Sequence, residues 1–210
     1  MLPAEVPLFP LPNVVLFPAA LLPLHIFEPR YRAMFGDALE GDRLIGMVML
    51  RPGWEKNYEG TPPVYPVGCA GFITHADRLP DGHFNVILCG LEKFRILGER
   101  RVGDGENPYR MARIESIEEI ARLGTESGLH EARSRLERLI ARRLHRSADD
   151  TIPKDIPAED LVRAIAQHLE PLEKQALLEC DGPLQRCLAL VELLEMKTIA
   201  TPPGGKTRMH

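Results

Sequence analysis

Residue types that could carry covalent or acid–base chemistry are scattered along this 210-residue chain without the spacing that such chemistry needs. No serine lies in a G-x-S-x-G or other glycine-rich elbow; the serines are Ser116, Ser127, Ser134 and Ser147. The histidines include no H-x-x-x-H pair, and none stands at helical spacing from a cysteine. Neither a nucleophilic hydrolase site nor a metal site is predicted.

The cysteines also lack a functional pattern. They show no C-x-x-C spacing and lie within apolar runs, at Cys69, Cys89, Cys180 and Cys187. This is typical of small buried hydrophobes in a reducing compartment rather than of disulfides or metal ligands. One string, 200–207, resembles a relaxed phosphate-binding loop, but too little chain follows it to form the helix that such a loop requires. No cofactor is predicted.

Composition and charge narrow the class of protein. Charged residues make up 27% of the chain and hydrophobic residues 44%, which is typical of globular proteins. The 26 Lys and Arg against 30 Asp and Glu give a net charge of -4, so a nucleic acid partner is not expected. The first thirty residues are rich in proline and carry no basic residue before Arg30, which excludes a signal peptide and a membrane span and favours a cytoplasmic location.

The aromatic residues divide the chain into two halves. The seven Phe, four Tyr and single Trp all lie between Phe9 and Tyr109. Two parts with different cores are therefore expected, and we place a β-rich domain at 1–122, a helical domain at 123–200 and a flexible tail at 201–210.

The first part has the pattern of a compact α+β unit. Prolines divide the apolar N-terminus into short extended pieces, and Glu28-Pro29 is typical of a helix start. That helix would bury Tyr31, Met34 and Phe35 and end near Gly41. Strands are expected at 21–27, 44–50, 67–75, 84–89, 93–97 and 109–117, with a hairpin turn at Asp81-Gly82. We predict an antiparallel pseudo-barrel of about six strands with one helix.

The second part is helical. Apolar residues recur at helical spacing from about residue 126, and Pro157, Pro171 and Pro183 each stand where a new helix would begin. The expected fold is a bundle of about four helices with an aliphatic core.

Aromatic side chains of the first part are the candidates for binding a partner. Trp54 and Tyr58 lie in a loop rich in proline and glycine, which is seldom buried, and Phe17 and Tyr65 are further candidates. The competing interpretation is that Phe9, Phe17 and Phe27 simply form the core. A basic stripe on one face of a helix leaves RNA binding open; it comprises Arg135, Arg138, Arg142 and Arg146. Acidic residues intersperse the stripe, and no aromatic residue is available there for base stacking.

Two runs near the N-terminus carry a family resemblance. Residues 8–18 read LFPLPNVVLFP and residues 22–31 read LPLHIFEPRY. Together with VGCAGFI at 67–73 and GLEKFRI at 90–96, these runs resemble the N-terminal domain of the Lon protease family. The resemblance covers nearly the whole chain and is weaker in the helical part.

The resemblance implies a PUA-like pseudo-barrel followed by helices, and a role in binding unfolded or degron-bearing polypeptides. The ATPase and Ser-Lys peptidase of the family would follow this region, so we expect a stand-alone, non-catalytic module whose partners are such polypeptides and a protease. Binding of RNA or a small molecule to the barrel is the alternative, and the oligomeric state stays open. We assign the motif residues to structure, with Glu28 as the helix-start acceptor and Arg30 as an ion-pair partner; the motif is His25, Phe27, Glu28, Pro29, Arg30 and Tyr31.

Overall fold

A computed structural model describes residues 2–58, 60–102, 109–119, 126–144, 152–153 and 155–200. The chain divides into two compact units. The first comprises residues 1–118 and 170–178, and the second comprises 119–169 and 179–210. The tail at 201–210, which the sequence predicts to be flexible, and the loop-like string at 200–207 lie almost wholly outside the described residues. The boundary at 122 stays a prediction.

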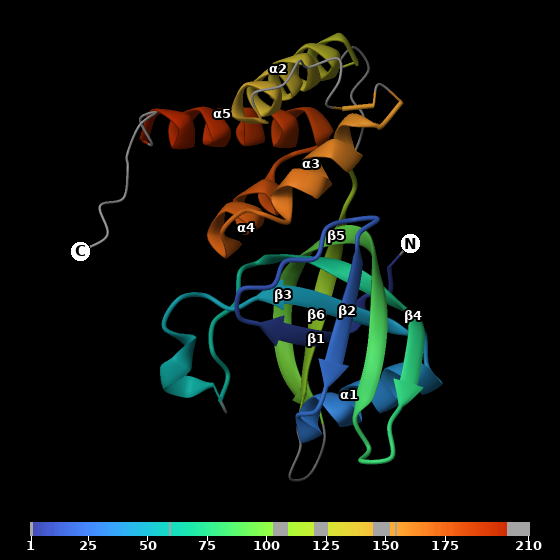
Figure 1. The fold of residues 1–210 in the computed structure, drawn as a ribbon. Helices are drawn as coiled ribbons and strands as arrows, with labels where there is room; N and C mark the ends of the chain where they lie inside the picture. The colour runs from blue at the N-terminus through green and yellow to red at the C-terminus, as the bar shows by residue number, and fades with distance from the viewer. Residues whose placement is uncertain are drawn as a thin grey trace, which may run out of the picture. The chain divides into compact units, whose positions relative to one another are not determined.

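The described strands of the first unit form one mixed sheet in the order β2, β5, β4, β3, β1, β6 (Figure 1). Their bounds are β1 Glu5–Leu11, β2 Leu21–Ile26, β3 Leu44–Met49, β4 Val67–Arg78, β5 Phe84–Val102 and β6 Tyr109–Ile117. The predicted antiparallel sheet is wrong at one pair, because β1 runs parallel to β3 with Leu8 opposite Gly46. The chain passes through β2 and α1 before it returns beside β1, and this crossover sets the parallel direction.

The long strand β5 connects the two ends of the sheet. The sequence predicts two strands here, whereas the structure has one, whose first part pairs with β2 and β4 and whose last part pairs with β6. The pairings β5, β4, β3, β1 and β6 therefore close into a cycle, with β2 outside it. Gly90 lies within β5, and a Cβ there would stand 2.1 Å from the carbonyl oxygen of Phe17. Only glycine allows this close approach of the two backbones.

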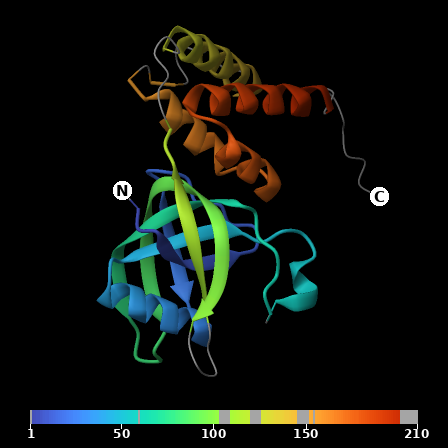
Figure 2. The same ribbon diagram turned by 180° about the vertical axis from the view of Figure 1, so that it is seen from behind.

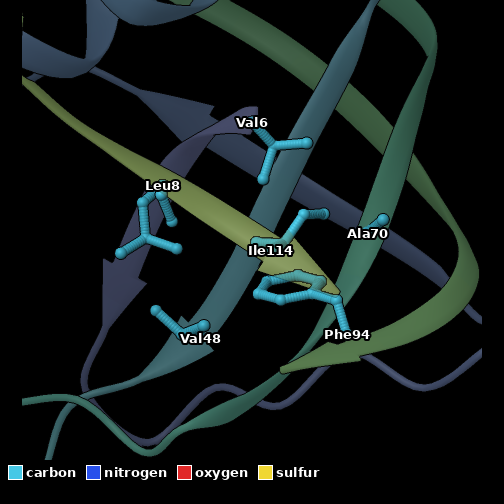
Figure 3. Packing of buried hydrophobic residues seen from close by; sticks show 7 residues of the cluster. Val6, Leu8, Val48, Ala70, Phe94 and Ile114 are labelled. Carbon is cyan, nitrogen blue, oxygen red and sulfur yellow. The ribbon is translucent and has the colours of Figure 1, made fainter. Parts of the chain in front are cut away.

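Apolar side chains from five strands fill the interior of this cycle (Figure 3). They are Val6, Leu8, Val48, Ala70, Phe94, Ala112 and Ile114. Phe94 is fully buried, and removing a buried phenyl ring of this kind typically costs about 3–5 kcal/mol. The core is therefore formed by residues distant in sequence, and it fixes the strands that carry the surface residues described below.

The helix α1, Pro29–Glu40, begins and ends where the sequence predicts. Pro29 occupies its first position, and the buried residues are Tyr31, Met34, Phe35 and Ala38. The Phe9 ring meets the Tyr31 ring edge-on at 4.6 Å between centroids. Figures 1 and 2 both show α1 beside the hairpin that joins β4 to β5. That hairpin turns at Gly82, whose φ of 80° is one that glycine adopts readily, as the Asp-Gly pair predicts.

Four helices follow, and the last three begin at or directly after Pro157, Pro171 and Pro183, as the sequence predicts. They are α2 Glu126–Leu144, α3 Ala158–Ala166, α4 Pro171–Glu179 and α5 Pro183–Ala200. The bundle of about four helices is not confirmed, because residues 171–178 of α4 belong to the first unit. There the buried Gln175 amide donates a 3.0 Å hydrogen bond to the Val67 carbonyl of β4, which a buried amide needs.

The other three helices form the second unit. The helix α5 packs against α2 and α3, and Leu136, Leu190 and Val191 are fully buried, so this part has the aliphatic core expected from its sequence. Arg135 of α2, which belongs to the basic stripe, forms an ion pair with Glu195 of α5 at 2.6 Å.

Candidate functional site

The outward face of β2 is unusually apolar. Leu21, Pro23, His25 and Phe27 stand at alternate positions and are all exposed, whereas Ile26 is buried. The exposed fraction is 67% for Leu21 and 57% for Phe27. The solvent face of an antiparallel sheet is normally polar, and exposed apolar side chains that share one face mark a contact surface.

The position of β2 in the sheet also favours a contact surface. Among the described residues β2 pairs only with β5, so it is an edge strand with one side open to a further strand. Pro23 fits such a place, because a residue without an N–H group is tolerated on a strand edge. An extended peptide can add to an edge of this kind through its backbone.

Directly after β2, the Glu28 carboxylate holds the loop that carries the aromatic candidates. The Tyr58 hydroxyl donates to Glu28 Oε1 at 2.6 Å, and Arg30 Nη2 donates to Oε2 at 2.9 Å. Arg30 Nη1 also donates to the Tyr58 carbonyl at 3.2 Å, and the guanidinium lies 4.6 Å from the centre of the Tyr58 ring. Burial raises the pKa of Tyr58, and the hydrogen bond to Glu28 raises it further, so the phenol stays a donor at neutral pH.

Of the roles expected for Glu28 and Arg30, the structure shows the ion pair but not the side-chain cap. Arg30 does form an ion pair with Glu28. The Glu28 side chain, in contrast, makes no capping hydrogen bond; its backbone carbonyl accepts from the N–H groups of Tyr31 and Arg32 at 3.0 and 2.9 Å. The carboxylate is available to bind Tyr58 because Glu28 is extended at the helix start, with ψ of 132°.

Trp54 and Tyr58 lie close together at the two ends of a single turn. Trp54 begins the short 3-10 helix η1, Trp54–Asn57, and Tyr58 follows it. Their rings meet at 5.3 Å between centroids with an interplanar angle of 64°. Both side chains are half-buried, so each presents part of its ring to solvent.

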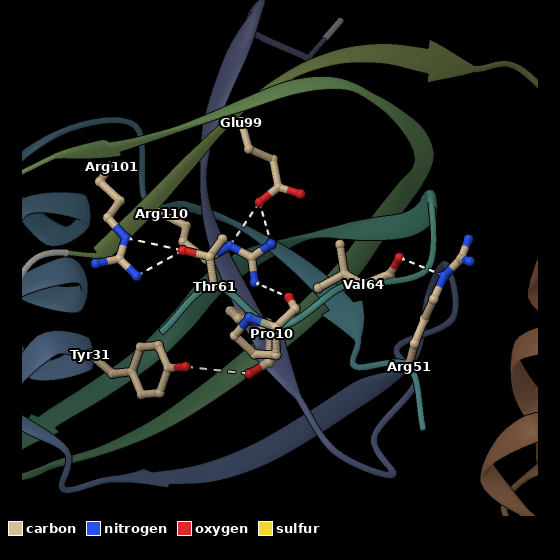
Figure 4. Close-up of polar contacts among 9 residues, drawn as sticks. Pro10, Tyr31, Arg51, Thr61, Val64, Glu99, Arg101 and Arg110 are labelled. Atoms are coloured by element: carbon tan, nitrogen blue, oxygen red, sulfur yellow. Dashed lines mark hydrogen bonds and ion pairs between the residues drawn. The ribbon is translucent and has the colours of Figure 1, made fainter. Parts of the chain in front are cut away.

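Arginines attach the rest of this loop to the sheet (Figure 4). Arg110, which is 8% exposed, pairs with Glu99 and donates to the Pro62 carbonyl at 3.0 Å. Arg101 of β5 donates to the Thr61 hydroxyl at 2.7 Å. Within the loop itself, Arg51 donates to the Val64 carbonyl at 3.0 Å. The loop that presents Trp54 and Tyr58 is thus held at several points along its length.

The remaining predicted candidates are placed differently. Phe17 is only 6% exposed, so the core interpretation applies to it and a partner could not reach it on this surface. Tyr65 is half-buried, and the Arg51 guanidinium lies 5.4 Å from the centre of its ring. The structure therefore brings together Trp54 and Tyr58 but gives Phe17 no part in the surface.

The sequence interpretation missed a group of neighbouring rings, of which His25 and Phe27 are exposed and His83 is half-buried. The ring centroid of His25 lies 6.2 Å from that of Phe27 and 5.2 Å from that of His83; we call these three residues the ring cluster. His25 is also hydrogen-bonded through Nδ1 to Asn85 Oδ1 at 2.8 Å. The expectation that Phe27 belongs to the core is wrong. The alternation of Phe27 with Pro23 and His25 gives only a weak signal, because Leu24 and Ile26 between them are apolar as well.

No metal site emerges in the described part of the chain. Within it, no group of three or more His, Cys, Asp and Glu could hold a metal ion. The four cysteines are thiols rather than disulfides; Cys69 and Cys187 are buried, and burial raises the pKa of Cys187 to about 11, which leaves it unreactive at neutral pH. None of the described helices combines the length and the apolar composition that a bilayer crossing requires.

These features define a mixed α+β module with exposed apolar side chains on and directly after its edge strand. The family described as the ATP-dependent protease La (LON) substrate-binding domain matches residues 5–196, and the chain belongs to this family.

Relatives and solved structures agree with this assignment. The chain is 26% identical over 198 residues to the Lon protease of Anaeromyxobacter dehalogenans and 28% identical over 210 residues to Lon protease 2 of Myxococcus xanthus, with 93% of the chain covered in each case. It spans only 22% and 24% of the length of these two proteins.

Two solved structures share the fold. The N-terminal domain of a Mycobacterium avium complex Lon protease matches with a TM-score of 0.65 and 15% identity, and covers 91% of this chain and 98% of that one. A Lon N-terminal domain protein from Xanthomonas campestris matches with a TM-score of 0.59 and 23% identity, and covers 91% and 97%.

Proposed function

We propose that this domain binds polypeptide segments that expose apolar side chains, as unfolded or degron-bearing proteins do. The binding surface, which we call the recognition surface, comprises Leu21, Pro23, His25, Phe27, Trp54 and Tyr58. The observation that carries the proposal is the row of exposed residues on and directly after the edge strand β2, with Leu21 at 67% and Phe27 at 57% exposure. The family description supports a polypeptide as the ligand.

An extended segment fits this surface better than a folded one does. Its backbone can lie along the open side of β2, while its apolar side chains contact Phe27 and the Trp54–Tyr58 pair. Because Glu28 and Arg30 already hold Tyr58, little conformational freedom of the loop is lost on binding.

The proposed role is non-catalytic, and cleavage of the bound polypeptide belongs to a protease partner. The closed cycle of strand pairings supports a PUA-like pseudo-barrel as the scaffold that we propose. The alternative, binding of RNA or a small molecule to the barrel, is not favoured by any observation here. The net charge is -4, and within the basic helix α2 Arg133 pairs with Glu137 and Arg135 pairs with Glu195.

The experiment is a titration of one fluorescently labelled protein in its folded and its chemically unfolded form. We expect the unfolded form to bind at least about tenfold more tightly, and Phe27→Ser to lose about tenfold in that affinity. Leu97 of β5, which is 49% exposed and lies outside the recognition surface, supplies the matched control Leu97→Ser. Equal binding of the two forms, or equal losses in the two variants, would contradict the proposal.

A further inference from the structure

Two arginines line one hollow next to the recognition surface. The hollow, of about 350 Å³, lies between α1 and the β4–β5 hairpin. The helix contributes Pro29, Arg32 and Gly36, and the hairpin contributes Arg78, Gly82 and Phe84. The Arg32 guanidinium reaches the hairpin, since a Cβ on Gly82 would clash with its Nη2 atom. The Arg78 guanidinium lies 5.9 Å from the centre of the Phe84 ring.

Neither arginine has a counter-charge in the part of the chain that the structure describes. The carboxylates of this region are engaged elsewhere: Glu28 with Arg30, Asp77 with His75, Asp81 with His83 and Asp37 with Tyr109. The Nε atom of Arg32 is buried and makes no hydrogen bond. Two guanidinium groups that line one hollow repel each other, and an anion between them would remove this repulsion.

We infer that Arg32 and Arg78 form a subsite for a carboxylate carried by the bound polypeptide. The inference rests on the proposed function and names its substrate class, a segment in which an acidic residue stands beside an apolar one. Residues that line the hollow are close in sequence to residues of the ring cluster. Pro29 lies two residues after Phe27, and His83 stands between Gly82 and Phe84. A carboxylate in the hollow and an apolar side chain on Phe27 can therefore come from neighbouring residues of one segment.

The first test compares short labelled apolar peptides that differ only in one Glu or Gln, both amidated at the C-terminus. We expect the Glu peptide to bind about tenfold more tightly, as charge-assisted hydrogen bonds to an arginine pair would give. The double variant Arg32→Gln, Arg78→Gln should abolish this preference. Arg95→Gln, at an exposed residue of β5 that does not line the hollow, should keep it. A Gln peptide with a free C-terminus shows whether a terminal carboxylate serves as well as a side chain.

The second test does not depend on peptide binding. In an NMR titration with sodium acetate, against sodium chloride at equal ionic strength, the side-chain Nε–H signals of Arg32 and Arg78 should shift saturably. If the arginine signals shift while neither peptide binds, the proposed function is refuted and the carboxylate site is supported. If both peptides bind equally and the signals do not respond to acetate, the proposed function stands and the subsite is refuted. A stronger response to inorganic phosphate than to acetate would overturn the assignment to a carboxylate.

Discussion

The Tyr58 hydroxyl donates a 2.6 Å hydrogen bond to the Glu28 carboxylate, and this contact joins residues thirty positions apart in sequence. It links the end of β2 to the loop that carries Trp54. The residues from His25 to Arg32 therefore have different structural roles within one short segment. His25 and Phe27 are exposed to solvent, and Glu28 and Arg30 bind the loop. Tyr31 is buried in the core, and Arg32 lines the hollow.

Removing only the Tyr58 hydroxyl should loosen the loop. Tyr58→Phe leaves the Glu28–Arg30 ion pair intact and should lower the free energy of unfolding by about 1 kcal/mol. Trp54 is the sole tryptophan, so its emission should shift to longer wavelength and its quenching by acrylamide should increase. Tyr65→Phe is the control, because the Tyr65 hydroxyl has no hydrogen-bond partner in the described part of the chain. Unchanged Trp54 fluorescence in Tyr58→Phe would refute this coupling.

Arg110 should matter more to stability than its neighbour Arg101. Arg110→Gln leaves the Glu99 carboxylate and the Pro62 carbonyl without a buried donor, and should cost about 2–3 kcal/mol in urea unfolding. Arg101 lies directly opposite Arg110 in the β5–β6 pairing and is exposed, so Arg101→Gln should cost less than about 1 kcal/mol. Similar costs for the two variants would contradict the role given to Arg110 in attaching the loop.

Two glycines of β5 should respond differently to the same substitution. Gly90→Ala places a Cβ 2.1 Å from the Phe17 carbonyl oxygen and should cost about 2–3 kcal/mol in free energy of unfolding. At Gly98 none of the described neighbours lies within 4 Å of the place that an added Cβ would take, so Gly98→Ala should change stability by less than about 1 kcal/mol. Thermal unfolding of both proteins measures the difference, and a tolerated Gly90→Ala would show that the two backbones can separate.

The local elements of the fold were predictable because their signals are local. Pro29 at the first helical position and the spacing of Tyr31, Met34 and Phe35 predict α1, and Asp81-Gly82 predicts its hairpin turn. The parallel pairing of β1 with β3 leaves no such signal, since it depends on where the chain returns after a crossover. The first unit also includes most of α4, where Gln175 contacts Val67, and no local signal connects residues so far apart in sequence.

The surface was harder to predict than the core. Both faces of β2 carry apolar residues, so the alternation that separates inside from outside is hidden in a run of leucine, proline, isoleucine and phenylalanine. Such a run predicts an interior position for Phe27, which is wrong. The hollow lined by Arg32 and Arg78 could not be seen at all, because it forms only where α1 meets a hairpin more than forty residues away.

The stability of the domain should fall in alkaline solution as Tyr109 ionises. Burial, together with a 2.7 Å hydrogen bond from its hydroxyl to Asp37, raises the pKa of Tyr109 to about 12, against 10.0 for an ordinary tyrosine. Between about pH 10 and 12 the unfolded chain loses this proton before the folded protein does, so stability declines as pH rises. Tyr109→Phe should make the decline shallower in urea unfolding measured across this range. An unchanged slope would contradict the assignment.

The most direct test of the central claim is to map where an unfolded polypeptide binds. We predict that backbone amide signals in an NMR titration shift most between Leu21 and Arg30 and between Trp54 and Tyr58, and that Phe27→Ser weakens these shifts at equal ligand concentration. Shifts confined to other parts of the chain, such as α2 and α5, would contradict the assignment of recognition to the end of β2 and the loop that Glu28 holds.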